Sequence, residues 1–190
     1  MKVLLFSGGL DSTALAYWLR PNRLLFIDYG QIPAAGERRA ATQIAKELDL
    51  ILDCRTADCR SFGSGDMAGL PSLGAVATEF WPYRNQLLLT LGAMLYSAEP
   101  VLTLLIGTIR SDEIHPDGSL AFISKMQDLL STQGNSRIEA PAIAMSSSAL
   151  QQNAGVPISI LSWAFSCHRA TEACGQCRGC NKYFQTIPIG

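Results

Sequence analysis

The chain has 190 residues, of which 48% are hydrophobic and 16% charged, and its formal net charge at pH 7 is −1. This composition is typical of one compact globular domain and excludes an intrinsically disordered chain. A net charge so close to zero gives no bulk attraction to nucleic acid or anionic lipid, so we expect neither as a partner. Every apolar stretch falls short of the roughly 20 residues that a membrane helix needs, and we expect a cytoplasmic protein.

Strand-like and helix-like patterns alternate along the chain. Apolar runs predict strands over residues 2–6, 23–28, 50–54, 101–107 and 137–140. Periodic apolar positions predict helices over 11–20, 36–48, 84–97, 120–130 and 146–154, the third of them buried on most sides. The order predicts a parallel sheet with helices on its faces, a three-layer α/β sandwich in a single domain spanning residues 1–190. Residues 60–80 are rich in Gly, Ser and Pro and predict a mobile loop or lid.

A glycine- and hydroxyl-rich turn follows the first predicted strand. It reads Ser7-Gly8-Gly9-Leu10-Asp11-Ser12-Thr13 and leads directly into a predicted helix. Ligands of parallel sheets bind at the carboxyl ends of the strands. Glycines allow a close approach of backbone to an anion, and a helix N-terminus offers free N–H groups. The turn therefore predicts a pyrophosphate site, although an ordinary turn with Asp11 or Ser12 as a helix cap has the same letters.

Cysteines gather near the end of the chain. Cys167, Cys174, Cys177 and Cys180 have the spacing C-x6-C-x2-C-x2-C. Four thiolates at this spacing favour a closed tetrahedral zinc site of structural type, in a zinc-binding segment over 163–184. An iron–sulfur cluster and a redox pair are the alternatives. The neighbouring His168 is a candidate substitute ligand, although such a histidine more often lies beside the ligands or at the surface.

The phosphate turn resembles the Ser-Gly-Gly-x-Asp-Ser loop of the N-type ATP pyrophosphatases, and the whole chain resembles the 7-cyano-7-deazaguanine synthases. The resemblance rests on matches in order along the chain: Ser7–Thr13, Asp28-Tyr29-Gly30-Gln31 with Glu37, Pro82 with Arg84-Asn85, Gly107 with Asp112, Pro116-Asp117, and the cysteine segment from Ser166. The resemblance implies a fold of the ATP pyrophosphatase type and a role in queuosine-precursor synthesis.

The resemblance also implies the ligands and the residues that bind them. The cofactors are ATP, Mg²⁺ and Zn²⁺, and the substrate is a 7-carboxy-7-deazaguanine that is adenylated and joined to ammonia or another amine. Catalysis is assigned to Ser7, Asp11, Ser12 and Arg84. ATP binding is assigned to Ser7, Gly8, Gly9, Leu10, Asp11, Ser12, Thr13, Asp28, Tyr29 and Gly30. Substrate binding is assigned to Gln31, Trp81, Arg84, Asn85, Gly107, Asp112 and Asp117. By residue type alone, Trp81 or Phe80 suits stacking on a flat ring, but a core position suits Trp81 as well. Arg84 in a surface ion pair and Asp117-Gly118 in a plain turn are the corresponding alternatives. Family members form homodimers by the same resemblance.

The chain departs from the family pattern around the substrate. Tyr83 replaces a glycine, Ile109 replaces an asparagine, and the segment 115–122 lacks the family's cysteine, arginine and glutamate. The lysine expected before the last helix is absent, and Ser146-Ser147-Ser148 occupies that region. Because two cations are lost from a site that handles anions, the reaction end point stays open between an amide and a nitrile.

Several functions remain open at this stage. One is a defence-system enzyme that conjugates a deazaguanine to a protein N-terminus. Another is a non-catalytic, nucleotide-binding scaffold subunit, which the missing cations favour and Asp11 disfavours. A sulfur transferase acting on transfer RNA would need a reactive thiol and a basic surface, and the metal-like spacing of the cysteines and the neutral charge argue against it.

Overall fold

The computed structural model describes residues 1–72 and 77–187. Residues 73–76, within the loop predicted over 60–80, and residues 188–190, within the predicted domain, lie outside the described residues. In the described part of the chain, no helix combines the length and the apolar character needed to cross a bilayer.

A five-stranded sheet forms the centre of the molecule, in the order β3-β2-β1-β4-β5. Its strands are β1 (Lys2–Leu5), β2 (Arg23–Asp28), β3 (Leu52–Thr56), β4 (Leu102–Leu105) and β5 (Ser136–Glu139). Every neighbouring pair is parallel. All four residues of β4 are buried, as expected for a strand that is covered on both faces. The predicted parallel sheet is therefore confirmed.

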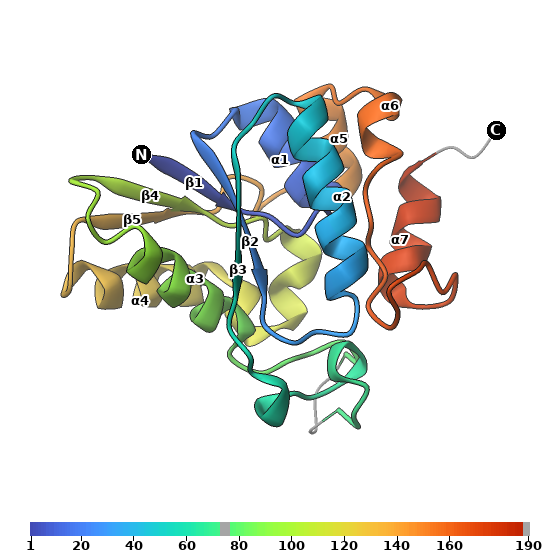
Figure 1. The fold of residues 1–190 in the computed structure, drawn as a ribbon, viewed down its shortest axis with the longest axis horizontal. Coiled ribbons are helices and arrows are strands. Elements are labelled where there is room, and N and C mark those ends of the chain that lie inside the picture. The colour runs from blue at the N-terminus through green and yellow to red at the C-terminus, as the bar shows by residue number, and fades with distance from the viewer. Residues whose placement is uncertain (73–76, 188–190) are drawn as a thin grey trace.

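Helices cover both faces of this sheet (Figure 1). One face packs against α1 (Leu10–Leu19), α2 (Ala34–Glu47), α5 (Ser147–Ala154) and α6 (Ile158–Leu161), and the other against α3 (Arg84–Leu95) and α4 (Leu120–Ser131). The two faces have separate apolar clusters, with Leu4 and Phe26 in one and Val3 and Leu25 in the other. Successive strand residues point to opposite faces, so each strand contributes to both clusters. The predicted three-layer α/β sandwich is confirmed.

Short helical segments complete the fold. Four 3₁₀ turns are η1 (Arg60–Phe62), η2 (Asp66–Ala68), η3 (Arg110–Ile114) and η4 (Pro116–Gly118). The last helix is α7 (Arg178–Thr186), which begins within the cysteine segment. Neither α6 nor α7 is predicted from the pattern of apolar residues.

The prediction that the third helix is buried on most sides is wrong. Of the twelve residues of α3, only Leu89 and Gly92 are buried. Gly92 faces Leu104 and Leu25, where a Cβ would lie 3.2 Å from Leu104, so α3 approaches the sheet closely along this line. Its other side is open, and Met94 is 66% exposed. Apolar residues on all sides of a helix do not by themselves bury it when only one layer covers the sheet.

The sheet order reverses direction between β1 and β4. From β1 the chain runs outward through β2 and β3, then returns to place β4 and β5 on the other side of β1. In open parallel sheets the crevice outside such a reversal, at the carboxyl ends of the strands, is the usual ligand site. The turn after β1 and the segment after β4 meet at this point.

Candidate active site

A cavity of about 280 Å³ opens at the carboxyl ends of β1, β2 and β4. Most of the residues that the sequence assigns to ATP and substrate line it. Those on its wall are Ser7, Gly9, Leu10, Asp11, Ser12, Tyr29, Gln31, Arg84, Asn85, Gly107 and Asp112. Concave sites with a few converging polar groups are the usual small-molecule sites of α/β proteins. The structure therefore brings four separate sequence segments to one place.

The phosphate turn has the geometry that an anion site needs. Gly8 has φ +74°, and a Cβ there would lie 2.7 Å from the backbone N of Ala41 in α2, so only glycine fits. Gly9 caps α1 without a side-chain hydrogen bond. The N–H groups of the first turn of α1 consequently remain available at the positive end of the helix dipole. Ser12 lies beside Ser7, with 3.5 Å between their hydroxyl oxygens.

Asp11 is held by two side chains from distant parts of the chain. The Ser147 hydroxyl donates to Asp11 Oδ1 at 2.6 Å, and the Lys182 ammonium pairs with Asp11 Oδ2. Ser147 is the first residue of α5, and Lys182 lies in the middle of α7. The carboxylate is thus fixed at the start of α1 with one counter-ion and one hydroxyl donor.

A polar wall forms on the other side of the cavity, around Glu37. Gln31 donates from Nε2 to Glu37 Oε2 at 2.8 Å and accepts from the Tyr29 N–H at 2.8 Å. Burial raises the pKa of Glu37 to about 7, although the hydrogen bond from Gln31 and the charge of Arg84 oppose the shift. Burial alone would lower the pKa of Arg84, but the surrounding Tyr29 and acidic groups reverse this effect and raise it. The wall therefore combines a fixed cation with a carboxyl group that titrates near neutral pH.

The segment after β4 contributes the acidic residues expected at the substrate. Asp112 lines the cavity, and its Oδ2 accepts from the Ile109 N–H at 3.0 Å. Asp117 does not line it. It is buried and holds Asn85 through two bonds, in which Asp117 Oδ2 accepts from the Asn85 N–H and the Asn85 side chain donates to the Asp117 carbonyl. Asp117 thus fixes the start of α3 behind the cavity wall.

Trp81 and four of the residues assigned to ATP are also absent from the wall. Trp81 is buried in the core and packs edge-on against Tyr29, with 5.0 Å between ring centroids, so its face is not presented to the cavity. Phe80 stacks instead on His115, with centroids 5.3 Å apart. The four ATP-assigned residues that do not line the cavity are Gly8, Thr13, Asp28 and Gly30. Gly8 packs against α2 behind the turn, and Thr13 is fully buried. The Asp28 carboxylate accepts from the Gly30 N–H at 3.0 Å.

Arg178 joins three segments at the cavity mouth. Its Nη1 donates to Glu79 Oε1 at 2.5 Å and lies 3.5 Å from His115 Nε2, while its Nη2 donates to the Ser111 carbonyl. Burial would raise the pKa of Glu79, but hydrogen bonds from His115 and Arg178 hold it well below its usual range. A second pair, Arg169 with Asp66 at 2.9 Å, links the same regions. Two arginines of the cysteine segment thus hold the loop that precedes α3.

The four predicted zinc ligands converge on one point. The sulfur atoms of Cys167, Cys174, Cys177 and Cys180 all lie within 4.8 Å of one another. The Cys177–Cys167 and Cys174–Cys180 sulfurs are 4.0 and 3.9 Å apart. Tetrahedral Zn²⁺ with Zn–S bonds of about 2.3 Å requires sulfurs about 3.8 Å apart, whereas a disulfide requires about 2.05 Å. The donor set therefore fits zinc.

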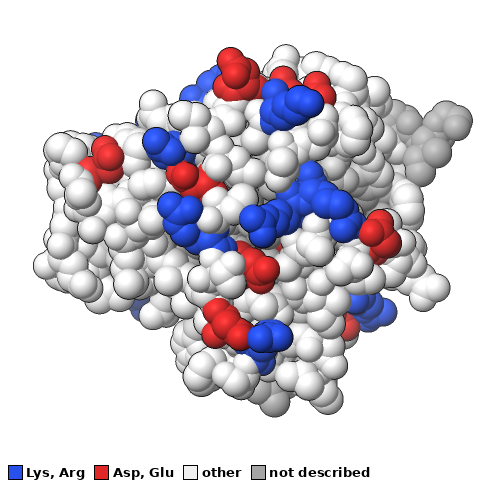
Figure 2. Space-filling view, viewed as in Figure 1, with Lys and Arg blue, Asp and Glu red and all other residues white. Residues whose placement is uncertain are grey.

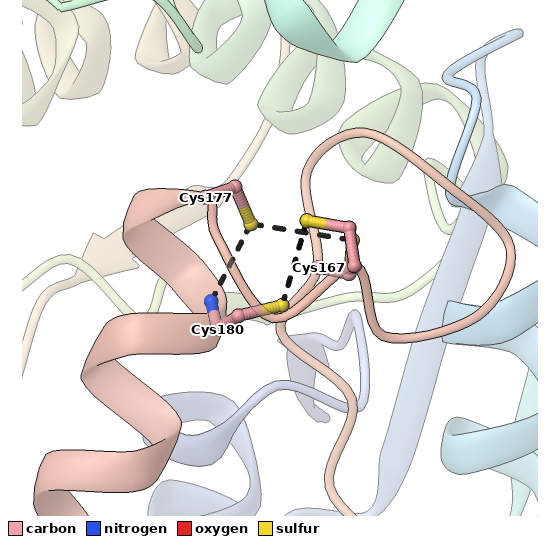
Figure 3. A group of neighbouring side chains, drawn as sticks. Cys167, Cys177 and Cys180 are labelled. Carbon is pink, nitrogen blue, oxygen red and sulfur yellow. Dashed lines mark hydrogen bonds between the residues drawn. The ribbon is translucent and has the colours of Figure 1, made fainter.

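Backbone N–H groups support these thiolates. The Cys180 N–H donates to Cys177 Sγ at 3.4 Å, as Figure 3 shows. The His168 N–H donates to the same sulfur at 3.3 Å, and the Arg169 N–H donates to Cys167 Sγ at 3.5 Å. Such bonds stabilise the charge of metal-bound sulfur. His168 lies outside the group of four sulfurs, and its ring lines the cavity. It contacts the cysteine site through its backbone.

The cysteine segment also lies directly against the phosphate turn. Phe165 donates its N–H to the Gly8 carbonyl at 2.9 Å, and a Cβ on Gly9 would lie 3.7 Å from the Phe165 carbonyl. In α7, a Cβ on Gly179 would lie 1.7 Å from the Ser166 carbonyl. Only glycine therefore allows the helix to pack this closely against the segment that contains Ser166. The two sequence motifs therefore form one structural unit.

Sequence reasoning missed three side chains of the site: Ser147, Arg178 and Lys182. Ser147 belongs to the serine triplet that occupies the region where the family pattern has a lysine, and its residue type alone does not indicate that it bonds Asp11. Arg178 and Lys182 are four residues apart, which places them on one face of a helix. That spacing, beside two metal ligands, was the available signal for cations at the site.

Charge on the molecular surface is mixed. On the face viewed in Figure 2, basic residues form small groups with acidic residues nearby, and most of the surface is uncharged. This face carries no broad basic patch of the kind that binds a nucleic-acid backbone.

Comparisons with known proteins identify the family of the chain. The family model described as "Queuosine biosynthesis protein QueC" matches residues 1–186. The chain is 33% identical over 138 residues to the 7-cyano-7-deazaguanine synthase 1 of Desulfitobacterium hafniense, covering 66% of this chain and 62% of that protein. It is 30% identical over 208 residues to the 7-cyano-7-deazaguanine synthase of Methanoculleus marisnigri, covering 94% and 90%. The synthase of Nitratiruptor sp. is 26% identical over 199 residues, covering 94% and 89%.

The first of these alignments spans less than two thirds of the relative, whereas the other two span most of it. The match of the family model includes the phosphate turn, the cavity and all four cysteines, and it confirms the resemblance inferred from the sequence. This chain therefore belongs to the QueC family of queuosine biosynthesis proteins.

Proposed function

We propose that the chain is an ATP-dependent carbon–nitrogen ligase that adenylates the carboxylate of 7-carboxy-7-deazaguanine and joins it to ammonia or another amine. One observation carries the proposal. The phosphate turn, with the fixed carboxylate of Asp11, opens into the same cavity as Arg84 and Asp112. A nucleotide bound at the turn would place its α-phosphate toward a substrate bound beside these side chains.

The reaction needs two displacements. A carboxylate oxygen of the substrate attacks the α-phosphorus of ATP, and the bond to the β-phosphate oxygen breaks as pyrophosphate leaves. The amine then attacks the acyl carbon and loses a proton, and AMP leaves with the bonding electrons to give the amide. A second adenylation and loss of the activated oxygen would give the nitrile named in the relatives. The family relation supports this scheme, and the amide is its minimal product.

The residues of the cavity suit these steps. The amides of the first turn of α1, with the Ser7 and Ser12 hydroxyls, offer donors to the leaving diphosphate. A bound Mg²⁺ would neutralise phosphate charge, and Asp11 beside these hydroxyls is the group suited to hold it. Arg84 can pair with a carboxylate or phosphate, and Asp112 can accept from the N–H groups of a guanine-like ring.

Binding of the substrate ring would also involve Gln31, Asn85 and Gly107. A Cβ on Gly107 would lie in ordinary contact with Ser12, 3.8 Å from its Cβ, so Gly107 lies directly beside the phosphate turn. Trp81 and Asp117 would act from behind the wall, through Tyr29 and Asn85. Zinc at the four cysteines would hold the adjoining wall, and the homodimer remains a prediction.

Product analysis tests the proposal. The protein is incubated with Mg-ATP, 7-carboxy-7-deazaguanine and ammonia, and AMP, pyrophosphate and product mass are measured. We expect AMP and the amide mass, and Asp11→Ala should abolish AMP formation because it removes the carboxylate at the leaving group. Asp128→Ala, on the exposed side of α4, serves as a matched control and should retain activity. An absence of AMP with the wild-type protein would contradict the ligase and favour a nucleotide-binding scaffold.

A further inference from the structure

Two cations on the last helix reach the cavity. Arg178 and Lys182 line it from one face of α7, although the family's expected lysine and arginine are absent from their places in the sequence. The inference below rests on the proposed use of the phosphate turn for ATP. It concerns what these two side chains do when the nucleotide enters.

Of the two cations, only Lys182 is paired with a residue of the phosphate turn. Arg178 is bound to Glu79, His115 and the Ser111 carbonyl, none of which belongs to the phosphate turn. Lys182 instead pairs with Asp11, at the first turn of α1. Because the Lys182 side chain is flexible, its ammonium can reach the anion site at the phosphate turn as well as Asp11.

The Lys182–Asp11 pair is largely shielded from water. Its side chains are 29% and 13% exposed, respectively. Removing the partner from a buried charge is costly, because the remaining charge is neither paired nor hydrated. If a divalent cation takes the place of Lys182 at Asp11, the ammonium needs a new anion. Phosphate oxygens bound at the adjacent turn would supply this anion. With both ligands bound, Asp11 pairs with the metal and Lys182 pairs with the phosphate, so neither side chain is left unpaired.

The position of Lys182 is fixed by contacts at the start of α7. Two of the four sulfurs, those of Cys177 and Cys180, lie at the start of the helix, where the Cys180 N–H donates to Cys177 Sγ. Gly179 packs closely against the Ser166 carbonyl, and the preceding Phe165 is bonded to Gly8. The helix therefore presents Lys182 at a set distance from the phosphate turn.

We propose that Lys182 is a phosphate-binding residue that exchanges partners, pairing with Asp11 when the site is empty and with the diphosphate oxygens of Mg-ATP when it is filled. Lys182 thereby makes metal and diphosphate bind cooperatively. It supplies from α7 a cation at the phosphate turn, although the lysine of the family pattern is absent from its place in the sequence.

Binding measurements on the whole protein test this exchange. Mn²⁺ alone is titrated by electron paramagnetic resonance, and inorganic pyrophosphate is titrated by calorimetry at a fixed Mn²⁺ concentration. In Lys182→Gln we expect Mn²⁺ alone to bind more tightly, by about threefold to tenfold, because Asp11 is no longer neutralised. Pyrophosphate should bind about tenfold more weakly, because a charge-assisted bond is lost. Lys182→Arg should keep pyrophosphate affinity within about threefold of the wild type.

A lysine outside the cavity provides the control. Lys46→Gln, at the exposed end of α2, should change neither titration. Zinc content of each variant is measured first, so that a lost fold is recognised. Opposite shifts for metal and pyrophosphate support the exchange, whereas equal binding in Lys182→Gln, or a parallel loss of both ligands, overturns it. If the wild-type protein binds neither pyrophosphate nor ATP, the proposed function itself fails.

Discussion

Glu37 provides a prediction in which the pH dependence has a definite sign. The residue is only 9% exposed and its carboxyl group accepts from Gln31, and burial raises its pKa from 4.5 to about 7. The folded state therefore binds this proton more tightly than the unfolded chain does. The stabilisation is fully present below the unfolded pKa and is lost as pH rises through the folded pKa.

The size of the effect follows from the shift. A difference of about 2.5 pKa units corresponds to about 3 kcal/mol, since one unit is about 1.4 kcal/mol. At pH 5 an unfolded glutamate is already partly ionised, so we expect about 2 to 3 kcal/mol of the loss to fall between pH 5 and pH 8. Glu37→Gln removes this term, because an amide accepts the same hydrogen bond without titrating.

The assay compares the two proteins by urea unfolding at several pH values. The stability of Glu37→Gln relative to wild type should rise by about 2 to 3 kcal/mol from pH 5 to pH 8. Effects shared by both proteins, such as protonation of the cysteines, cancel in this difference. Glu47→Gln, on the exposed end of the same helix, should show no comparable trend. A Glu37→Gln difference that is constant with pH would refute the reasoning.

Two further predictions concern the motifs. Elemental analysis should find one zinc ion per chain in the wild-type protein and none in Cys177→Ser. The same variant should bind pyrophosphate more weakly, because α7 is no longer held at the phosphate turn. If Cys177→Ser keeps both zinc and pyrophosphate affinity, the two sites are not linked. Gly8→Ala should lower the free energy of unfolding by at least about 1–2 kcal/mol, which is the cost of a left-handed backbone for a non-glycine residue. It should also abolish pyrophosphate binding, because the new Cβ would lie 2.7 Å from the Ala41 N and displace the turn. Unchanged affinity in Gly8→Ala would exclude the turn as the phosphate site.

The sequence was most informative where local pattern decides structure. The run Arg23–Asp28 forms β2 with the predicted bounds, and the phosphate turn and cysteine spacing lie where strand order and metal geometry require them. These features depend on neighbouring residues and on a short list of ligands. Element ends elsewhere differ by a few residues, because hydrogen bonding at helix and strand ends depends on tertiary contacts.

Long-range pairings were beyond the reach of local pattern. Nothing adjacent to Asp11 indicates that Ser147 and Lys182 hold its carboxylate, because both lie more than 130 residues away. Trp81 fits a stacking role by residue type, yet the close packing of Tyr29 turns it into the core. Roles that depend on which way a side chain faces required the structure.

The contact between Lys182 and Asp11 spans 171 positions of the chain, which has a consequence for biosynthesis. The glycines, hydroxyls and Asp11 carboxylate of the turn all lie within residues 7–13, but Lys182, the cation that pairs with Asp11, is synthesised 171 positions after it. Contacts of such sequence separation form late, because a long loop must close before they contribute. A nascent chain stopped before α7 would therefore expose an uncompensated carboxylate at the proposed nucleotide pocket, and ATP would meet the complete set of charges only after α7 had left the ribosome.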